Sequence, residues 1–467
     1  MSTQVELPRV PAAADPGAGA SPAEAGSAYA WLVVAVLVFA SIVSYIDRQV
    51  VAIVVGPMKA YLHVSDSQIG WLYGIFAIFY AVAGIPIAWL ADRSSRTTLI
   101  GVGILLWSVV TTLCGVARTF GHFALARIGV GVGEAVLTPT VSSLIGDLLP
   151  RNQVPLGVSI YQAGAVAGSA IAFIVGGTIL SLVQNAGTLT LPVLGAVEPW
   201  QQLFLYCGCL GLVAGPLFLF LREPARRGAG TARQTATLAD ILAFYRSNSR
   251  TLIFHHAGFL LLSLMGFGFA FWSVSYFTRV HGLPAATAAQ SFGWIYLICG
   301  SCASVWPPLL AARLARAGHR DANIKAAMIG GGLAIPFIVI SQQMPTPFWA
   351  FVAYVPAMLC VPSPFGLAYG SLPVIAPAAM RAVVTSVFMF VVNLGMLLGP
   401  PIAGFFNERL FPQPDGVRYS LSTLTLICGS GGLVLLALCR KHYARSLQAA
   451  DAFENSRSGG SIAEIRR

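Results

Sequence analysis

Twelve long apolar runs constrain this chain more than any other feature of its sequence. Each run is close to the twenty mostly apolar residues that cross a bilayer as a helix, and a helix satisfies its own backbone hydrogen bonds in lipid. The runs lie near residues 30–55, 68–91, 98–117, 122–149, 154–183, 200–222, 251–278, 288–312, 323–343, 347–377, 382–407 and 420–439. We therefore predict an all-α membrane protein with twelve transmembrane helices in the lipid bilayer.

The sparse charges agree with this fold class and predict its orientation. Only 10% of the 467 residues are charged, against roughly 25% in a soluble globular domain. The net charge of +11 does not indicate nucleic-acid binding, because the basic residues are spread over short loops on one side of the spans. Basic loops face the cytoplasm. We therefore predict a multi-pass protein of a bacterial-type inner (plasma) membrane with both termini cytoplasmic.

The chain divides into two similar halves of six spans. Residues 70–73 (Gly-Trp-Leu-Tyr) match residues 293–296 (Gly-Trp-Ile-Tyr), and residues 162–168 match residues 393–399, with glycines at the same places. Such recurrence indicates duplication of a six-helix unit, as in transporters whose substrate site lies between the halves. The predicted organisation is a disordered cytoplasmic tail (1–28), a six-helix bundle (29–222), a cytoplasmic linker (223–250), a second six-helix bundle (251–441) and a cytoplasmic tail (442–467).

Four charged residues lie deep inside predicted spans: Asp47 and Arg48 in the first, Arg127 and Glu134 in the fourth. A charge at bilayer depth costs roughly 2.5–3.5 kcal/mol on insertion scales, so such residues are paired or line a wet cavity. Because Asp47 and Arg48 are adjacent on a helix, we expect one to face a neighbouring helix and the other the cavity. Arg127 and Glu134 are two turns apart and share a face. We predict that Arg48 reaches Glu134; a purely structural ion pair is the alternative.

The loop after the second predicted span resembles a signature of the major facilitator superfamily, G-x-L-A-D-R-x-G-R-R. Residues 88–97 read Ala-Trp-Leu-Ala-Asp-Arg-Ser-Ser-Arg-Thr. They keep the core of Asp92, Arg93 and Arg96 and depart from the signature at its first, eighth and last positions. The resemblance implies that these three residues form a cytoplasmic latch between helices in the outward-open state. A plain surface turn with positive-inside arginines is the alternative.

Two further motifs narrow the resemblance. Residues 127–135, Arg-Ile-Gly-Val-Gly-Val-Gly-Glu-Ala, resemble the superfamily's R-x-x-x-G-x-G-x-A signature. The first span carries Tyr-x-Asp-Arg-Gln at residues 45–49, and the fourth carries Gly-x-Gly-Glu at residues 131–134. This combination looks like the Spinster branch of the superfamily, and the resemblance covers roughly residues 30–440.

The Spinster resemblance implies proton-linked movement of lysophospholipids or sphingoid-type lipids. By motif match, Asp47, Arg48 and Glu134 carry the coupling to protons, and the spacing of Arg127 from Glu134 adds that arginine to the set. The anion:cation symporters of organic acids also have a Tyr-x-Asp-Arg first span. A symporter of organic anions and protons is therefore the main alternative for the substrate.

A substrate cavity is predicted between a charged first half and an apolar, aromatic second half, because no Asp or Glu lies deep within the second half's spans. The predicted cavity residues are Tyr45, Arg48, Tyr161, Gln162, Trp272, Tyr276 and Asn393. An apolar lobe facing a charged one suits an amphipathic anionic substrate. Each aromatic residue, taken singly, is also compatible with ordinary packing.

Together these features predict a proton-coupled secondary transporter, monomeric, working by alternating access on a small amphipathic or anionic substrate. No cofactor or metal is expected, because the eight cysteines lie mostly in apolar segments and His255-His256 has no further ligand nearby in sequence. The chain is predicted not to be an enzyme, because it lacks a nucleophile–base pair, a phosphate loop and a sizeable extramembrane domain. A lipid-modifying enzyme and a non-transporting receptor are the alternatives from other classes.

Overall fold

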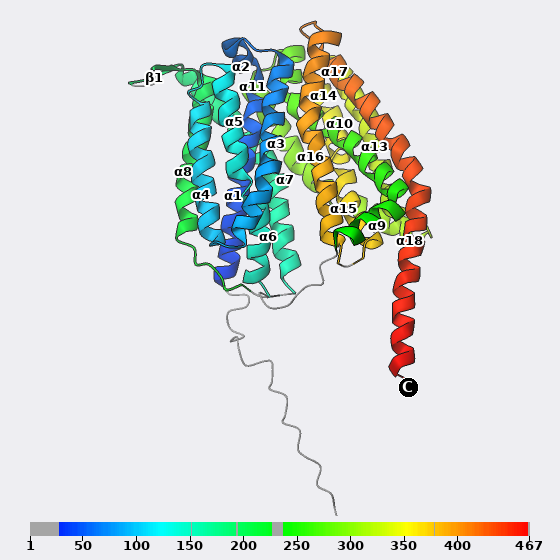
Figure 1. Ribbon diagram of the computed structural model, residues 1–467. Coiled ribbons are helices and arrows are strands. Elements are labelled where there is room, and N and C mark those ends of the chain that lie inside the picture. Colours follow the sequence, from blue (N-terminus) through cyan, green and yellow to red (C-terminus); the bar gives the residue numbers. More distant parts are fainter. Residues whose placement is uncertain (1–27, 151, 193–194, 227–236, 378, 466–467) are drawn as a thin grey trace, which may run out of the picture.

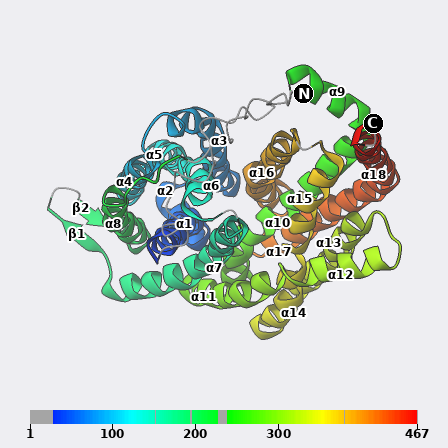
Figure 2. The ribbon, with the colours of Figure 1, turned by 90° about the horizontal axis from the view of Figure 1, so that it is seen from below.

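Two bundles of helices lie side by side in the computed structural model (Figures 1 and 2). The structure describes residues 28–150, 152–192, 195–226, 237–377 and 379–465, with side chains as far as residue 452. Residues 1–27 of the predicted N-terminal tail and residues 227–236 of the predicted linker lie outside the described residues. The first helix begins and the last helix ends at the same end of the bundles (Figure 1), which we call the terminal end; the opposite one is the distal end.

The first half holds six helical segments of membrane-crossing length and hydropathy. One of these segments is split into two helices, and a short antiparallel hairpin precedes the last. The elements of this half are α1 (Ala28–Ile53), α2 (Val55–Leu62), α3 (Asp66–Ala91), α4 (Arg96–Cys114), α5 (Phe120–Glu134), α6 (Leu137–Leu148), α7 (Val154–Ala186), β1 (Leu189–Leu191), β2 (Gly195–Val197) and α8 (Pro199–Leu219).

The second half follows the linker helix and contains three short π-helical turns, labelled η. After the linker helix α9 (Leu238–Ser247), its elements are α10 (Ser249–His281), α11 (Ala285–Ile295), η1 (Tyr296–Gly300), α12 (Trp306–Arg316), α13 (Ala322–Gln343), α14 (Pro347–Cys360), α15 (Ser363–Ile375), α16 (Arg381–Phe405), η2 (Phe406–Leu410), α17 (Val417–Leu424), η3 (Thr425–Gly429) and α18 (Ser430–Ile465). Helix α10 begins two residues before the predicted bundle, and residues 442–465 of the predicted tail continue α18 as helix.

The described residues contain eleven helical segments long and apolar enough to cross a membrane. Residues 285–316 form the remaining span in pieces, because the helix passes through η1 and a turn at residues 303–305 before α12 begins. Pro307 and Pro308 follow this turn, and each lacks the N–H that would continue the helix from the preceding residues. The predicted fold of twelve helices in two halves is confirmed.

The recurring Gly-Trp motifs lie where the two halves touch. A Cβ atom added to Gly70 of α3 would lie 2.6 Å from the Cα atom of Pro401 in α16, and one added to Gly293 of α11 would lie 2.9 Å from the carbonyl oxygen of Ala170 in α7. Only glycine permits such close approach of two backbones. The two motifs therefore make equivalent contacts between the halves, α3 with α16 and α11 with α7.

The second recurring pattern packs helices within each half. A Cβ atom on Gly168 of α7 would lie 3.1 Å from the Cα atom of Ile42 in α1, and one on Gly399 of α16 would lie 2.6 Å from the carbonyl oxygen of Leu264 in α10. Small residues spaced four apart allow such close helix packing in membranes. The repeat detected in the sequence is thus a repeat of helix contacts.

Contacts between the halves are concentrated at the distal end. Along the face of α3 that carries Gly70, Asp66 at the distal end is 2% exposed, whereas Ile85 toward the terminal end is 76% exposed. The α16 face that meets α3 behaves in the same way, because Phe390, toward the terminal end, is 56% exposed. Leu156, near the terminal end of α7, is also exposed. The halves are therefore joined at the distal end and separated at the terminal end.

Candidate functional site

Adjacent residues of α1 face different neighbours. The Asp47 carboxylate is buried, and its Oδ1 atom lies 3.7 Å from Nη1 of Arg127 in α5. The Thr111 hydroxyl of α4 donates a hydrogen bond to Asp47 Oδ2, and Arg127 Nη1 donates to the backbone carbonyl of Asp47 at 3.4 Å. Asp47 and Arg127 thus connect α1 to the helices packed beside it.

Arg48 turns to the other side and meets Glu134, as the sequence predicted. Its Nε atom lies 2.6 Å from Glu134 Oε2, to which the Ser44 hydroxyl also donates at 2.7 Å. Glu134 is 0% exposed, while the Arg48 guanidinium lies over aromatic rings of α1 and α3. The distances from its carbon atom to the ring centroids are 5.0 Å for Tyr45, 5.2 Å for Phe76 and 4.7 Å for Tyr80.

A break in the fourth span sets the position of Glu134. Helix α5 ends at Glu134 and α6 begins at Leu137. Pro139 explains the break, because it has no N–H for the carbonyl of Ala135 and its ring would clash with that carbonyl in a continuous helix. The sequence analysis did not use Pro139, although a proline inside a predicted span indicates a break or kink in the helix.

The two ion pairs leave buried polar atoms without partners. Among the described residues, Asp47 Oδ1, Glu134 Oε1 and the Nε and Nη2 atoms of Arg127 have no hydrogen-bond partner, although all are buried. Buried polar atoms are otherwise nearly always bonded. These carboxylates and this guanidinium therefore have unused capacity to bind a proton or a small polar group.

A cavity of about 270 Å³ lies between the two halves beside Arg48. Its polar side chains come mainly from the first half: Tyr45, Arg48, Gln49, Tyr73 and Ser169. Its apolar wall comes mainly from α10, α14 and α15, including Phe267, Phe271, Met358, Val361 and Phe365. The cavity is therefore amphipathic, with a cation on one side and an aromatic, aliphatic surface on the other.

The predicted cavity residues divide into two groups. Tyr45, Arg48 and Asn393 line the cavity, whereas Tyr161, Gln162, Trp272 and Tyr276 are outside its described lining. Trp272 is fully buried and its Nε1 atom donates to the carbonyl of Pro400 at 3.0 Å. The Tyr276 hydroxyl donates to the carbonyl of Ser341 at 2.7 Å. Both aromatic residues thus pack within the second half, while Gln49 and Phe271 are lining residues that the sequence analysis missed.

Comparison with known proteins gives the family. The family description that matches residues 37–400 is Major Facilitator Superfamily. The chain belongs to this superfamily. The match covers most of both halves, from within α1 to near the end of α16.

The relatives of this superfamily member include Spinster-type transporters. It is 27% identical to protein spinster of Drosophila melanogaster over 53% of its own length and 38% of that protein. It is 27% identical to the sphingosine-1-phosphate transporter SPNS2 of Danio rerio over 52% of its length and 47% of that protein. The chain thus spans less than half the length of these two relatives. It is also 23% identical to the probable L-galactonate transporter of Escherichia coli (strain K12), over 87% of this chain and 88% of that one.

Among solved structures, the fold is similar to that of a bacterial homolog of the human lysosomal transporter Spinster in an inward-facing and occupied conformation. The TM-score is 0.72 with 24% identity, over 90% of this chain and 97% of that one. The resemblance to the superfamily and its Spinster branch predicted from the motifs is confirmed. The similar proteins are transporters, in agreement with the prediction that the chain is not an enzyme.

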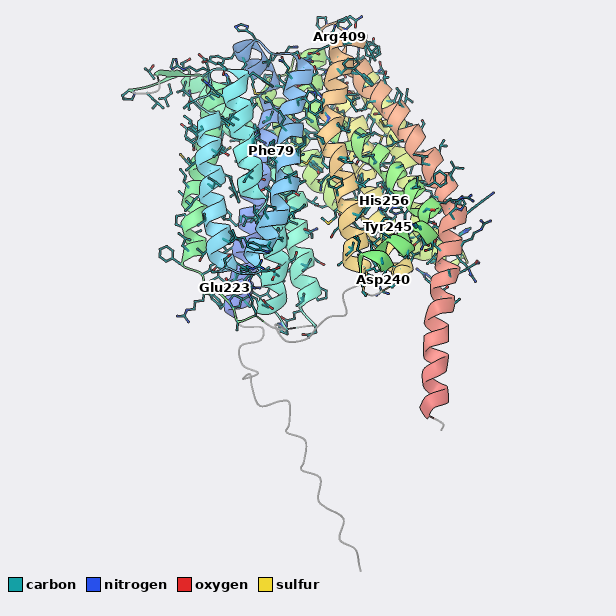
Figure 3. All side chains as sticks on the ribbon, in the orientation of Figure 1. Phe79, Glu223, Asp240, Tyr245, His256 and Arg409 are labelled. Carbon is teal, nitrogen blue, oxygen red and sulfur yellow. The ribbon has the colours of Figure 1, made fainter. Side chains whose placement is uncertain are left out.

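The superfamily signature at residues 88–97 lies at the terminal end of the first half, and its described contacts remain within that half and the segment after α8. Arg96 is 1% exposed; it pairs with Asp147 of α6, and its Nε atom lies 2.7 Å from Glu223 Oε1. Figure 3 shows Glu223 at this end of the bundle. The Arg93 guanidinium lies 3.7 Å from the Trp89 ring centroid.

Two acids at this end were missed by the sequence analysis, Asp147 and Glu223. Burial alone would raise the pKa of Glu223, but the backbone N–H of Thr97 and the guanidinium of Arg96 outweigh burial and hold that pKa below its ordinary value. Asp92 is exposed, and its backbone carbonyl accepts a hydrogen bond from Arg226. The role of Asp92, Arg93 and Arg96 as a latch in another conformation remains a prediction.

A cluster at the distal end joins the halves. The Asp66 carboxylate at the start of α3 accepts hydrogen bonds from Lys59 Nζ at 2.6 Å, Arg279 Nη2 at 2.9 Å and Asn407 Nδ2 at 3.0 Å. The Ser67 hydroxyl beside it donates to Glu408 Oε2 at 2.7 Å. Arg279, Asn407 and Glu408 belong to the second half, and their partners belong to the first. We call the whole cluster the distal gate: Lys59, Asp66, Ser67, Arg279, Asn407 and Glu408. The sequence analysis did not single out any of them as functional.

Proposed function

We propose that this chain is a proton-coupled secondary transporter that moves a small amphipathic anion, such as a lysophospholipid or sphingoid-type lipid, by alternating access. The observation that carries the proposal is the ion pair of Arg48 with Glu134. Arg48 lines the cavity, whereas Glu134 lies fully buried behind it at 2.6 Å. A single guanidinium thus lies between a buried acid and the space for substrate.

Competition for Arg48 supplies the coupling mechanism. Separating a buried ion pair without replacing either partner costs about 3–5 kcal/mol, because an uncompensated charge remains. A proton on Glu134 neutralises the carboxylate and frees Arg48 for an anionic headgroup. When the anion leaves, Arg48 returns to Glu134 and the proton is released. In this mechanism neither charge is left alone in the membrane.

Asp47 and Arg127 take the structural part in this proposal. Their side chains are 4% and 0% exposed, and neither residue belongs to the described cavity lining. They orient α1 against α4 and α5, so that Arg48 is held toward the cavity.

The cavity's shape supports an amphipathic substrate. Its volume of about 270 Å³ lies just below the roughly 300–1,000 Å³ typical of ligand sites. It therefore suits a headgroup and the first part of a chain, with a longer tail continuing past Phe267 and Phe365 on the apolar wall. Asn393 is an amide on the second-half side that would contact a hydroxyl or amine of the substrate.

The orientation belongs to the same proposal. The terminal end carries basic residues in loops and last helical turns, including Arg93, Arg222 and Arg313, which indicates that it faces the cytoplasm. With the halves joined at the distal end, the described conformation is then inward-open. The protein would sit in a bacterial-type inner membrane and act as a monomer.

Uptake into proteoliposomes tests the coupling. Glu134→Gln removes the titratable group but keeps a similar shape, so we expect substrate exchange to persist while acceleration by a pH gradient is lost. Asp240→Asn is the matched control, because Asp240 is an exposed acid on α9, outside the cavity (Figure 3). Equal pH-driven uptake by the wild type and Glu134→Gln would reject the proposal.

A symporter of small organic anions is the second candidate. The similarity to the probable L-galactonate transporter favours it, because that alignment covers 87% of this chain. Thermal-shift binding of lysolipids against sugar acids, on the wild type and Arg48→Gln, separates the two. Stabilisation by lysolipids that requires Arg48 supports the lipid proposal, and stabilisation by sugar acids alone supports the second candidate.

A further inference from the structure

A second cavity lies at the terminal end of the second half, away from the central one. Its volume is about 460 Å³, and it is formed by the turn after α12, the start of α13 and the outer helix α18. The residues that matter here are Gly318, His319, Arg320 and Asn323, with Tyr443 and Leu447 opposite. Gly318 has a φ of +87°, which glycine adopts without strain, and the resulting sharp turn precedes His319 and Arg320. The two cavities share no described lining residue.

A basic side chain outside the lining, Lys325, contacts the cavity residue His319. Lys325 Nζ lies 3.0 Å from His319 Nε2, a distance at which a neutral imidazole accepts a hydrogen bond from the ammonium. In the described part of the chain, neither Lys325 nor Arg320 forms an ion pair with a carboxylate. Arg320 lines the cavity, and Lys325 lies beside it through its contact with the lining residue His319. Two cationic groups without a counter-ion among the described residues therefore lie at or next to one concave site.

The surrounding sequence adds to this positive charge. Asp321 is the sole acidic residue in the stretches 311–326 and 440–446, and its carboxylate is already paired with Arg440. The other Lys and Arg residues of these stretches have no ion pair among the described residues: Arg313, Arg316, Lys441 and Arg445. The site thus has a strong excess of positive charge that an anion would relieve.

The apolar side chains beside the site indicate to which kind of molecule the anionic group belongs. Leu309 lies one turn before Arg313 on α12 and is 59% exposed, and Leu438 of α18 is half exposed. Val374 of α15 lines the cavity itself and is likewise about half exposed. Exposed apolar side chains next to basic ones, at the end of membrane-spanning helices, are typical of the boundary between acyl chains and headgroups.

We propose that this cavity binds the phosphate headgroup of an anionic membrane phospholipid. Arg320 and Lys325 neutralise the phosphate, the Asn323 amide and His319 supply further polar contacts, and the acyl chains lie along the apolar surface of α12 and α18. The bound lipid joins α12, α13 and α18 from outside. This site is distinct from the transport cavity and does not depend on the proposed substrate.

The test is a thermal-shift titration of the delipidated full chain in detergent. Phosphatidylglycerol is expected to raise the melting temperature, whereas phosphatidylcholine and inorganic phosphate are not. In Arg320→Gln/Lys325→Gln, half-maximal stabilisation should need at least about tenfold more phosphatidylglycerol, since each basic residue near an anionic lipid surface contributes on the order of one kcal/mol. The matched control is Arg246→Gln/Arg250→Gln, which removes the same charge from exposed positions at the same end of the same half.

Native mass spectrometry of the same samples counts lipid adducts and does not depend on stability. Loss of the phosphatidylglycerol adduct in Arg320→Gln/Lys325→Gln, but not in Arg246→Gln/Arg250→Gln, supports the site. Equal adducts in both double variants, or equal loss in both, overturn it. Stabilisation by inorganic phosphate alone overturns the assignment to a lipid and makes the ligand a free anion.

Discussion

Removing one carboxylate at the distal gate should open the distal end. Among the described residues of the first half, Asp66 is the one that both Arg279 and Asn407 contact through hydrogen bonds. A hydrogen bond to a charged group contributes about 1.5–3 kcal/mol when protected from water. Arg279 is 22% exposed, so solvent weakens its share, and Asn at position 66 would keep one acceptor oxygen. We estimate a loss of about 2 kcal/mol in Asp66→Asn, or roughly a thirtyfold shift toward the state with the distal end open.

Distances between spin labels measure this shift. Labels at Ala60→Cys of α2 and Arg409→Cys of η2 report on the two halves, and both residues are exposed. Figure 3 shows Arg409 at the distal end. The exposed native cysteines Cys209 and Cys302 are first replaced by serine. With the unchanged gate, the two labels should give a single short distance. Asp66→Asn should add a second population in which the labels are farther apart.

A matched control distinguishes the loss of a contact between the halves from the loss of a surface charge at the same end. Asp415→Asn removes an acid at the same end whose partner, Arg418, lies three residues away in the same half, so the distance distribution should not change. Arg279→Gln should act like Asp66→Asn, and the double variant should shift the equilibrium by less than the sum of the two. An unchanged distribution in Asp66→Asn would refute the gate.

Two further predictions concern other contacts. Gly70→Ala should also favour the open distal end, because its Cβ would lie 2.6 Å from the Cα atom of Pro401, whereas Gly56→Ala, with nothing within 4 Å, should not; the same label distances check this. Glu223→Gln should lower the melting temperature at neutral pH by the equivalent of about 1 kcal/mol. Because the folded pKa of Glu223 lies below its ordinary value, its contribution is present above the ordinary pKa and is lost as pH falls through the lower, folded one. The difference between the two proteins should therefore vanish in acid, and a difference that persists there would contradict the argument.

The sequence was most informative where a residue is costly to bury. A charge in a membrane span must find a partner, so Arg48 and Glu134 could be paired before any coordinates were known. The aromatic residues carried no such constraint. Helices that are apolar on every side do not reveal which face meets a cavity, and Trp272 and Tyr276 accordingly pack inside the second half instead. The distal gate was missed for a related reason, since Asp66 lies at the end of a span, where a charge is unremarkable until its partners from the other half are seen.

The glycine contacts between the halves affect the rate of conformational exchange as well as the packing of the halves. At Gly70 the backbones of the two halves meet with no side chain between them, and at Gly293 the backbone of α7 and the Ile174 side chain lie against the glycine. Interlocked side chains would have to adopt new rotamers before one half could move relative to the other, and each such change would add to the activation barrier. The backbone contact at Gly70 needs no such step, so the ion pairs of the distal gate and the ring contacts between the halves, such as Phe173 with Phe292, should set the rate at which the two sides alternate.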